Sequence, residues 1–115
     1  MKIIDGGVTA AEGFQAAGLA AGIKKGNTKD MAMLYSKVPC EAAGTFTTNV
    51  VKAAPVKWDQ QVVKSGAKAQ AVIVNSGIAN ACTGEEGMGY CKETAEAAAK
   101  ALNIDAAGVL VGSTG

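Results

Sequence analysis

The C-terminal half of the chain places short apolar runs on either side of one long periodic segment. Ala71–Val74 and Val109–Val111 are apolar and mostly β-branched, which predicts two buried strands. Between them, apolar positions recur at alternating spacings of three and four, the stripe of an amphipathic helix: Met88, Cys91, Ala95, Ala98 and Leu102. A strand, a helix and a strand in this order predict a right-handed parallel crossover, that is, a βαβ-like unit.

Local signals predict where this helix begins and ends. Thr83 and Glu86 have the spacing of a capping box, in which a hydroxyl and a carboxylate satisfy free N–H groups at a helix N-terminus. Glu96 and Lys100 form an i,i+4 pair in the favourable orientation, and Asn103 is a suitable C-terminal stop. The pattern therefore predicts a helix that starts after Thr83 and ends before Asn103.

The N-terminal half is less regular. Residues 14–23 have apolar positions at mixed spacing with glycines between them, which favours an irregular or strand-like segment over a helix. Lys24–Asn27 has the composition of a turn. In Asp30–Val38, Met31, Met33 and Tyr35 alternate with Ala32, Leu34 and Ser36, which predicts a strand that Pro39 ends.

Two further segments precede the apolar run at Ala71. Gly44–Thr48 is a run of high β propensity, and the polar residues Asp59–Lys64 predict one short helix. Trp58, the only tryptophan, is expected to anchor that helix. No repeat, low-complexity tract or linker divides the chain, so residues 1–115 are interpreted as a single, incomplete α/β domain.

Composition changes this picture in one respect. Apolar residues make up 49% of the 115 residues, but aromatic residues make up only 4% and much of the remainder is alanine. Small side chains let layers approach closely but fill little volume each. We therefore expect part of the apolar surface to be covered by something outside this chain.

Charge and residue types exclude several classes of function. The net charge is +1, carried by lysines, and the chain has no arginine and no histidine. Without bidentate arginine contacts or a basic block, nucleic-acid binding is not expected. Without histidine, the chain cannot by itself form a Ser-His or Cys-His catalytic pair. Any catalysis must use another base.

The cysteines and the termini give no sign of a metal site, a disulfide framework or a leader. Cys40, Cys82 and Cys91 are odd in number and lack CxxC spacing. Cys82 precedes a helix N-terminus, where a thiolate would be stabilised, but no partner base is evident. No signal peptide and no apolar run of membrane-spanning length occurs, so we expect a soluble cytoplasmic protein with no membrane contact.

Two loops after predicted strands could carry chemistry. Asn75–Gly84 leads from a strand into a helix N-terminus, where free N–H groups can bind an anion; structural loop packing is the alternative. Val111–Gly115 follows a buried strand, and a hydroxyl beside glycine there can present donors to a developing oxyanion. An ordinary turn is the alternative for the second loop. The hydroxyl-rich run Thr45–Asn49 is a weaker candidate.

Longer blocks of small and polar residues span almost the whole chain: Gly6-Gly7-Val8-Thr9-Ala10 with Gly13-Phe14, Ala43-Gly44-Thr45-Phe46-Thr47-Thr48-Asn49, Val74-Asn75-Ser76-Gly77 with Ala79-Asn80-Ala81-Cys82-Thr83-Gly84, and Val109-Leu110-Val111 with Ser113-Thr114-Gly115. In this order they resemble the N-terminal part of the alpha chain of the glutamate N-acetyltransferase/ornithine acetyltransferase family of arginine biosynthesis. The resemblance implies an α/β layered sheet-and-helix sandwich of the ornithine acetyltransferase type. One departure is Ile78, where the family usually has asparagine.

The resemblance also implies an activity. Such enzymes cleave themselves before a threonine, and the freed threonine of the beta chain receives an acetyl group from N2-acetylornithine and passes it to glutamate. The family's oxyanion-hole pair maps onto Thr114 and Gly115. No cofactor is implied; in bifunctional members acetyl-CoA is a further acetyl donor. The expected partner is the beta chain of the same precursor, in a heterotetramer of two alpha and two beta chains.

The chain ends at Gly115, before the positions where the family has its self-cleavage site and nucleophile. We therefore expect it to be inactive without the downstream chain. Two other interpretations stay open on the sequence: a related N-terminal-nucleophile aminopeptidase or amidase, and a non-catalytic fragment whose Asn75–Gly84 loop binds a small anion.

Overall fold

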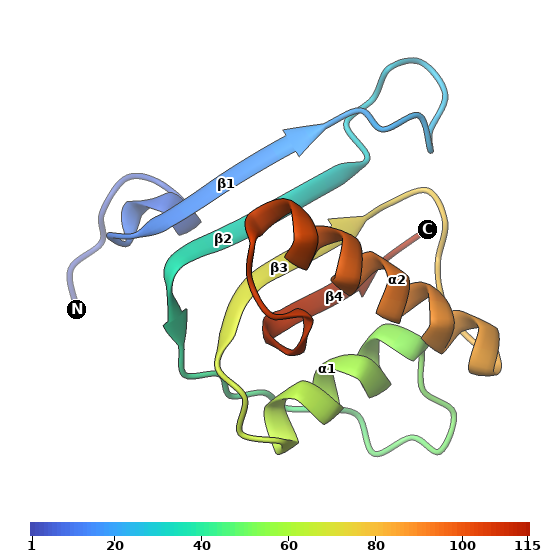
Figure 1. Cartoon of the computed structure of the whole chain (residues 1–115). Helices are drawn as coiled ribbons and strands as arrows, with labels where there is room; N and C mark the ends of the chain where they lie inside the picture. Colours follow the sequence, from blue (N-terminus) through green and yellow to red (C-terminus); the bar gives the residue numbers. More distant parts are fainter.

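The computed structural model describes residues 1–115 as a mixed α/β structure with one four-stranded sheet and two helices (Figure 1). The order along the chain is η1 (Val8–Ala10), β1 (Phe14–Leu19), β2 (Met31–Cys40), α1 (Ala54–Lys64), β3 (Ala69–Asn75), α2 (Gly84–Leu102), η2 (Ala106–Gly108) and β4 (Val109–Ser113). The sheet order is β1-β2-β3-β4, with β1/β2 and β2/β3 antiparallel and β3/β4 parallel. The predicted strand–helix–strand unit and its parallel pairing are confirmed.

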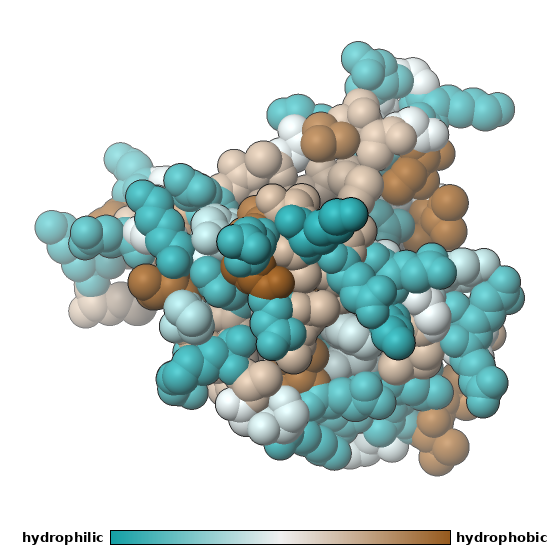
Figure 2. Space-filling model, in the orientation of Figure 1, coloured by the Kyte–Doolittle hydropathy of each residue, from teal (hydrophilic) through white to brown (hydrophobic).

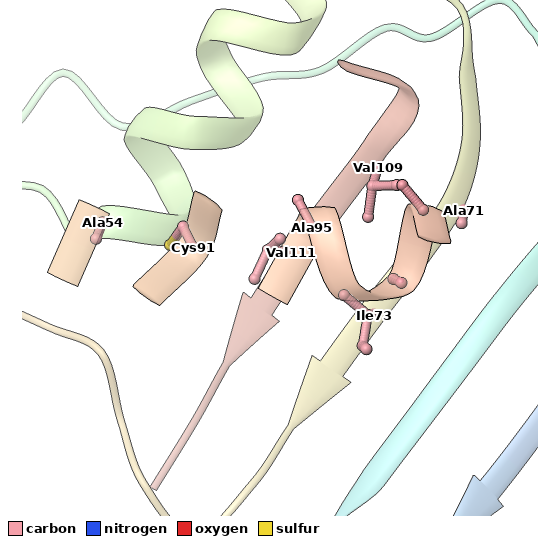
Figure 3. Close-up of a cluster of buried hydrophobic side chains, with 9 residues drawn as sticks. Ala54, Ala71, Ile73, Cys91, Ala95, Val109 and Val111 are labelled. Carbon is pink, nitrogen blue, oxygen red and sulfur yellow. The ribbon is translucent and has the colours of Figure 1, made fainter. Parts of the chain in front are cut away.

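Helix α2 packs its predicted stripe onto the sheet. Cys91 and Ala95 are 1% and 0% exposed, and they share a buried cluster with Ile73 of β3 and Val111 of β4 (Figure 3). Small residues at these positions let the helix lie close to the strands. The helix ends as predicted, because Asn103 adopts the left-handed conformation with φ 55°.

The predicted capping box at the start of α2 is wrong. Thr83 is the N-cap residue, but its side chain makes no bond to the helix N–H groups. Its hydroxyl donates instead to Oδ1 of Asn80, three residues earlier in the loop. The Glu86 carboxylate accepts from the hydroxyl of Tyr90 at 2.7 Å. The Thr83 hydroxyl and the Glu86 carboxylate therefore bond to other side chains nearby and not to the N–H groups at the start of the helix.

Helix α1 begins earlier than the prediction of Asp59–Lys64. It starts at Ala54, with Pro55 in its first turn, where a missing N–H costs nothing. Trp58 anchors it as expected: its indole N–H donates to the carbonyl of Val109 in β4 at 2.9 Å. The prediction rested on polar residues, and the first turn of the helix is apolar, with Ala54 and Pro55 buried. The start of the helix was therefore missed.

The N-terminal strands are β1 and β2, and they agree with the strand-like prediction for residues 14–23 and 30–38. The predicted end at Pro39 is wrong, because β2 continues to Cys40, with irregular pairing to β3 after Tyr35. Gly44–Thr48 forms no strand, which corrects the interpretation from its β propensity. That propensity needs a partner strand, and this segment has none.

The two faces of the sheet differ in their surroundings. Side chains alternate along each strand, so those next to the buried Ile73 and Val111 point away from α2. These half-buried apolar side chains are Leu34, Val72, Val74 and Leu110. Apolar residues are also exposed among polar ones on the face shown in Figure 2. That an outside partner covers such surface stays a prediction. None of the helices is long and apolar enough to cross a bilayer.

Candidate active site at the carboxyl end of β3 and β4

The carboxyl ends of the two parallel strands lie side by side. Asn75, the last residue of β3, is in register with Ser113, the last residue of β4. Thr114 and Gly115 continue beyond β4 at the same edge of the sheet, and both are exposed. This is the edge where the loop Ser76–Thr83 leaves for α2, so both sequence-predicted loops meet at one place (Figure 1).

Backbone bonding decides which donors near Thr114 are free. Its own N–H donates to the carbonyl of Asn75 at 3.0 Å. The Thr114 hydroxyl and the Gly115 N–H make no hydrogen bond within the chain. The Thr114 N–H is therefore not available as an oxyanion donor, whereas the Thr114 hydroxyl and the Gly115 N–H are.

The side chain of Asn75 ties the two strand ends and the following loop together. Its Oδ1 accepts from the hydroxyl of Ser113 at 2.7 Å. Its Nδ2 donates to the carbonyl of Ile78 at 3.1 Å. Residue 78 therefore enters this network through its backbone carbonyl. The Ile78 side chain is 65% exposed.

A pocket of about 480 Å³ adjoins these residues, between the sheet and α2. Its lining includes Asn75 and Ser113 as well as the apolar Met31, Ile73 and Val111. Thr114 and Gly115 are not part of its lining. The pocket thus lies against the helix side of the strand ends, and the free donors lie beyond it.

Asp30 fixes the neighbouring β1–β2 loop, a role that the sequence analysis missed. Its carboxylate is buried and accepts from the N–H groups of Ala21, Ile23 and Lys24 at 2.7, 2.8 and 2.9 Å. These bonds, that from Lys24 foremost and that from Ala21 next, lower the pKa of Asp30. The Asp30 carbonyl accepts from Ser76 N–H at 2.8 Å, so the loop after β3 is held as well. A single aspartate before a strand does not indicate from the sequence that it holds two loops.

The anion site expected at the N-terminus of α2 gains no support from the local charges. Glu85 and Glu86 both lie in the first turn, where their carboxylates already interact with the helix dipole and repel an anion. Asn80 fills the same region, with Nδ2 donating to the carbonyl of Gly87 at 2.9 Å. The loop's polar groups are therefore largely engaged by the chain itself.

The cysteines form no catalytic arrangement. Cys82 is exposed, with a left-handed φ of 55°. Cys91 is buried, which raises the pKa of its thiol and keeps it neutral. No group of three or more histidine, cysteine, aspartate or glutamate side chains is arranged to hold a metal ion.

Comparison with known proteins decides the family. A family model described as the ArgJ family matches residues 15–115, which is most of the chain. The chain belongs to the ArgJ family. The ArgJ "arginine biosynthesis bifunctional protein" of Gloeobacter violaceus is 52% identical over 112 residues, covering 97% of this chain and 28% of that protein. The ArgJ protein of Thermotoga neapolitana is 53% identical over 104 residues, covering 90% of this chain and 26% of that protein. The chain thus spans about a quarter of the length of these ArgJ relatives.

Solved ArgJ-family structures share the fold. A crystal structure of the bifunctional protein ArgJ from Bacillus halodurans matches with a TM-score of 0.89 and 42% identity, over 96% of this chain and 57% of that one. A structure of ornithine acetyltransferase from Mycobacterium tuberculosis, complexed with ornithine, matches with a TM-score of 0.89 and 52% identity. That match covers 95% of this chain and 59% of the other. The α/β arrangement of sheet and helices is therefore that of part of the ArgJ fold.

Proposed function

We propose that this chain is the N-terminal part of the alpha chain of an ornithine acetyltransferase and that Thr114 and Gly115 form its oxyanion hole. The observation that carries the proposal is the pair of free donors, the Thr114 hydroxyl and the Gly115 N–H, at the carboxyl end of β4. Its substrate class is supported by the 52% identity to an ornithine acetyltransferase that was solved with ornithine.

The proposed reaction assigns one role to this chain. The N-terminal threonine of the beta chain attacks the acetyl carbonyl of N2-acetylornithine, and its own amine accepts the hydroxyl proton. The carbonyl oxygen becomes negative, and the donors of Thr114 and Gly115 stabilise it. The C–N bond then breaks, ornithine leaves with the proton, and the acetyl group stays on the threonine. Glutamate takes the acetyl group through the reverse steps.

The base in this scheme is an amine of the beta chain, which suits a chain without histidine. Acetyl-CoA is proposed as a second acetyl donor, in keeping with the word bifunctional in the relatives' names. No cofactor takes part in either transfer.

The proposed partner is the beta chain of the same precursor, within a heterotetramer of two alpha and two beta chains. The half-buried apolar side chains on the sheet face away from α2 support a covering partner, completing a layered sheet-and-helix sandwich. We place the protein in the cytoplasm; a relative from rice carries the word chloroplastic in its name, so the compartment differs within the family.

The test is an acetyl-transfer assay on the native protein with isotopically labelled N2-acetylornithine. Appearance of the label in N-acetylglutamate, dependent on added glutamate, supports the proposal. Release of labelled acetate without transfer would identify an amidase instead. Absence of both would leave only a binding role for this chain.

A further inference from the structure

We propose that Asn75 is a positioning residue for acetyl transfer: through Ser113 and the backbone of Thr114 it holds the oxyanion-hole donors in their working orientation. This inference rests on the proposed function and assigns Asn75 a role that acts through the donors.

Three groups of Asn75 bond to three residues in two segments, the end of β4 and the loop after β3. Its carbonyl accepts from the N–H of Thr114 at 3.0 Å. Its Oδ1 accepts from the hydroxyl of Ser113 at 2.7 Å. Its Nδ2 donates to the carbonyl of Ile78 at 3.1 Å. One residue thus fixes the two residues immediately before Gly115 and the loop that passes beside them.

The segment that Asn75 holds is the one that carries the proposed donors. Thr114 and Gly115 lie beyond the last residue of β4 and are exposed. Asn75 is held firmly, because β3 is an inner strand in which Asn75 is in register with Met31 of β2 on one side and Ser113 of β4 on the other. Asn75 therefore links the segment that carries the donors to an inner strand of the sheet.

Orientation matters because oxyanion donors act at short range. They stabilise the transition state only when they lie about 2.7–3.1 Å from the developing oxyanion. A misplacement of about 1 Å can cost about 100-fold in rate. Without the bond from Ser113 to Asn75, Thr114 keeps its N–H bond to the Asn75 carbonyl but loses the support of the neighbouring side chain, so we expect its hydroxyl to be oriented less precisely.

The chemistry requires an amide at this position. Asn75 uses its oxygen to accept from Ser113 and its nitrogen to donate to Ile78 in the same conformation. An aspartate could accept but not donate, and its negative charge would oppose an oxyanion nearby. An alanine would lose both side-chain bonds while keeping the backbone bond to Thr114.

The experiment measures kcat and KM for acetyl transfer in the complete native enzyme. Asn75→Ala and Ser113→Ala should each lower kcat about 10-fold to 100-fold and change the KM for N2-acetylornithine and for glutamate much less. Ser113→Thr keeps the hydroxyl and has the adjacent pocket for its methyl group, so it should restore most of kcat. The double variant should be no slower than the slower single variant, because both remove the same bond.

The control is Ser36→Ala, which also deletes a short serine bond, from its hydroxyl to the carbonyl of Val38 at 2.6 Å. Ser36 lies in β2 towards the opposite end of the sheet, so its kcat should stay near that of the unaltered enzyme. Wild-type kcat in Ser113→Ala, or an equal loss in Ser36→Ala, would overturn the positioning role alone. No transfer by the unaltered enzyme would overturn the proposed function too.

Discussion

The indole N–H of Trp58 donates to the carbonyl of Val109 at 2.9 Å, across 51 positions of the sequence. The next residue, Asp59, accepts from the N–H of Val111 through Oδ1 at 2.9 Å. Strand β4 has β3 on one side only, so these two side chains of α1 occupy bonding positions that a further strand would use. The helix therefore holds in place the strand that carries Ser113 and leads to Thr114.

Replacing Trp58 with phenylalanine should destabilise the protein by about 1 kcal/mol. Phenylalanine keeps a smaller aromatic ring, but the carbonyl of the fully buried Val109 loses its bond to the indole. Urea unfolding followed by circular dichroism measures the change. Tyr90→Phe is the matched control, since it deletes an exposed bond to Glu86 and should have almost no effect. Equal midpoints for Trp58→Phe and the unaltered protein would contradict the anchoring role.

Asp59→Asn should stabilise the protein at neutral pH. Burial raises the pKa of Asp59, although the bond from Val111 N–H opposes the rise. Because the folded state binds this proton more tightly than the unfolded chain, this contribution to stability is fully present below the ordinary value of about 4 and is lost as the pH rises through the higher folded-state pKa. Asparagine keeps an oxygen for Val111 and carries no charge. The variant should melt at a higher temperature than the unaltered protein at pH 7, and this difference should disappear near pH 3. A lower melting temperature at both pH values would contradict this account.

Asp30→Asn should have the opposite pH dependence. The N–H groups of Lys24, Ala21 and Ile23 lower the pKa of Asp30, so its ionised form stabilises the fold. That stability is fully present above the ordinary value of about 4 and is lost as the pH falls through the folded-state pKa. The variant should melt earlier than the unaltered protein at pH 7, and the difference should shrink at pH 2–3. A difference in melting temperature that does not change with pH would show that the charge of Asp30 does not contribute to stability.

Thr114→Ala in the complete enzyme should lower kcat about 10²–10³-fold, because one of the two free donors is lost. Thr114→Ser keeps the hydroxyl and should retain most of the activity. Thr28→Ala, an exposed threonine in the β1–β2 loop, serves as the control and should turn over normally. An unchanged rate for Thr114→Ala would remove this residue from the oxyanion hole.

Local periodicity was enough to predict β3, α2 and β4. The stripe through Cys91 and Ala95, and the stop at Asn103, depend on residues a few positions apart, so their spacing carries the information. The capping box failed because its Thr83 hydroxyl had a competing acceptor in Asn80. The strand expected at Gly44–Thr48 failed because a strand needs a neighbour, which propensity does not reveal.

The candidate site was only partly readable from the sequence. Pattern alone placed loops after β3 and β4, and the choice of Thr114 and Gly115 came from the family resemblance. The role of Asn75 was hidden because its bond to Ser113 spans 38 positions. Spacing along a chain does not encode which strand ends become neighbours, so the network appears only once β3 and β4 are paired.

The most direct test of the acetyl-transfer account is intact-mass analysis with N-terminal sequencing of the native protein, before and after incubation with N2-acetylornithine. The account predicts a second polypeptide that begins with threonine and gains the mass of one acetyl group, which glutamate then removes. A single uncleaved polypeptide that gains no acetyl group would contradict it.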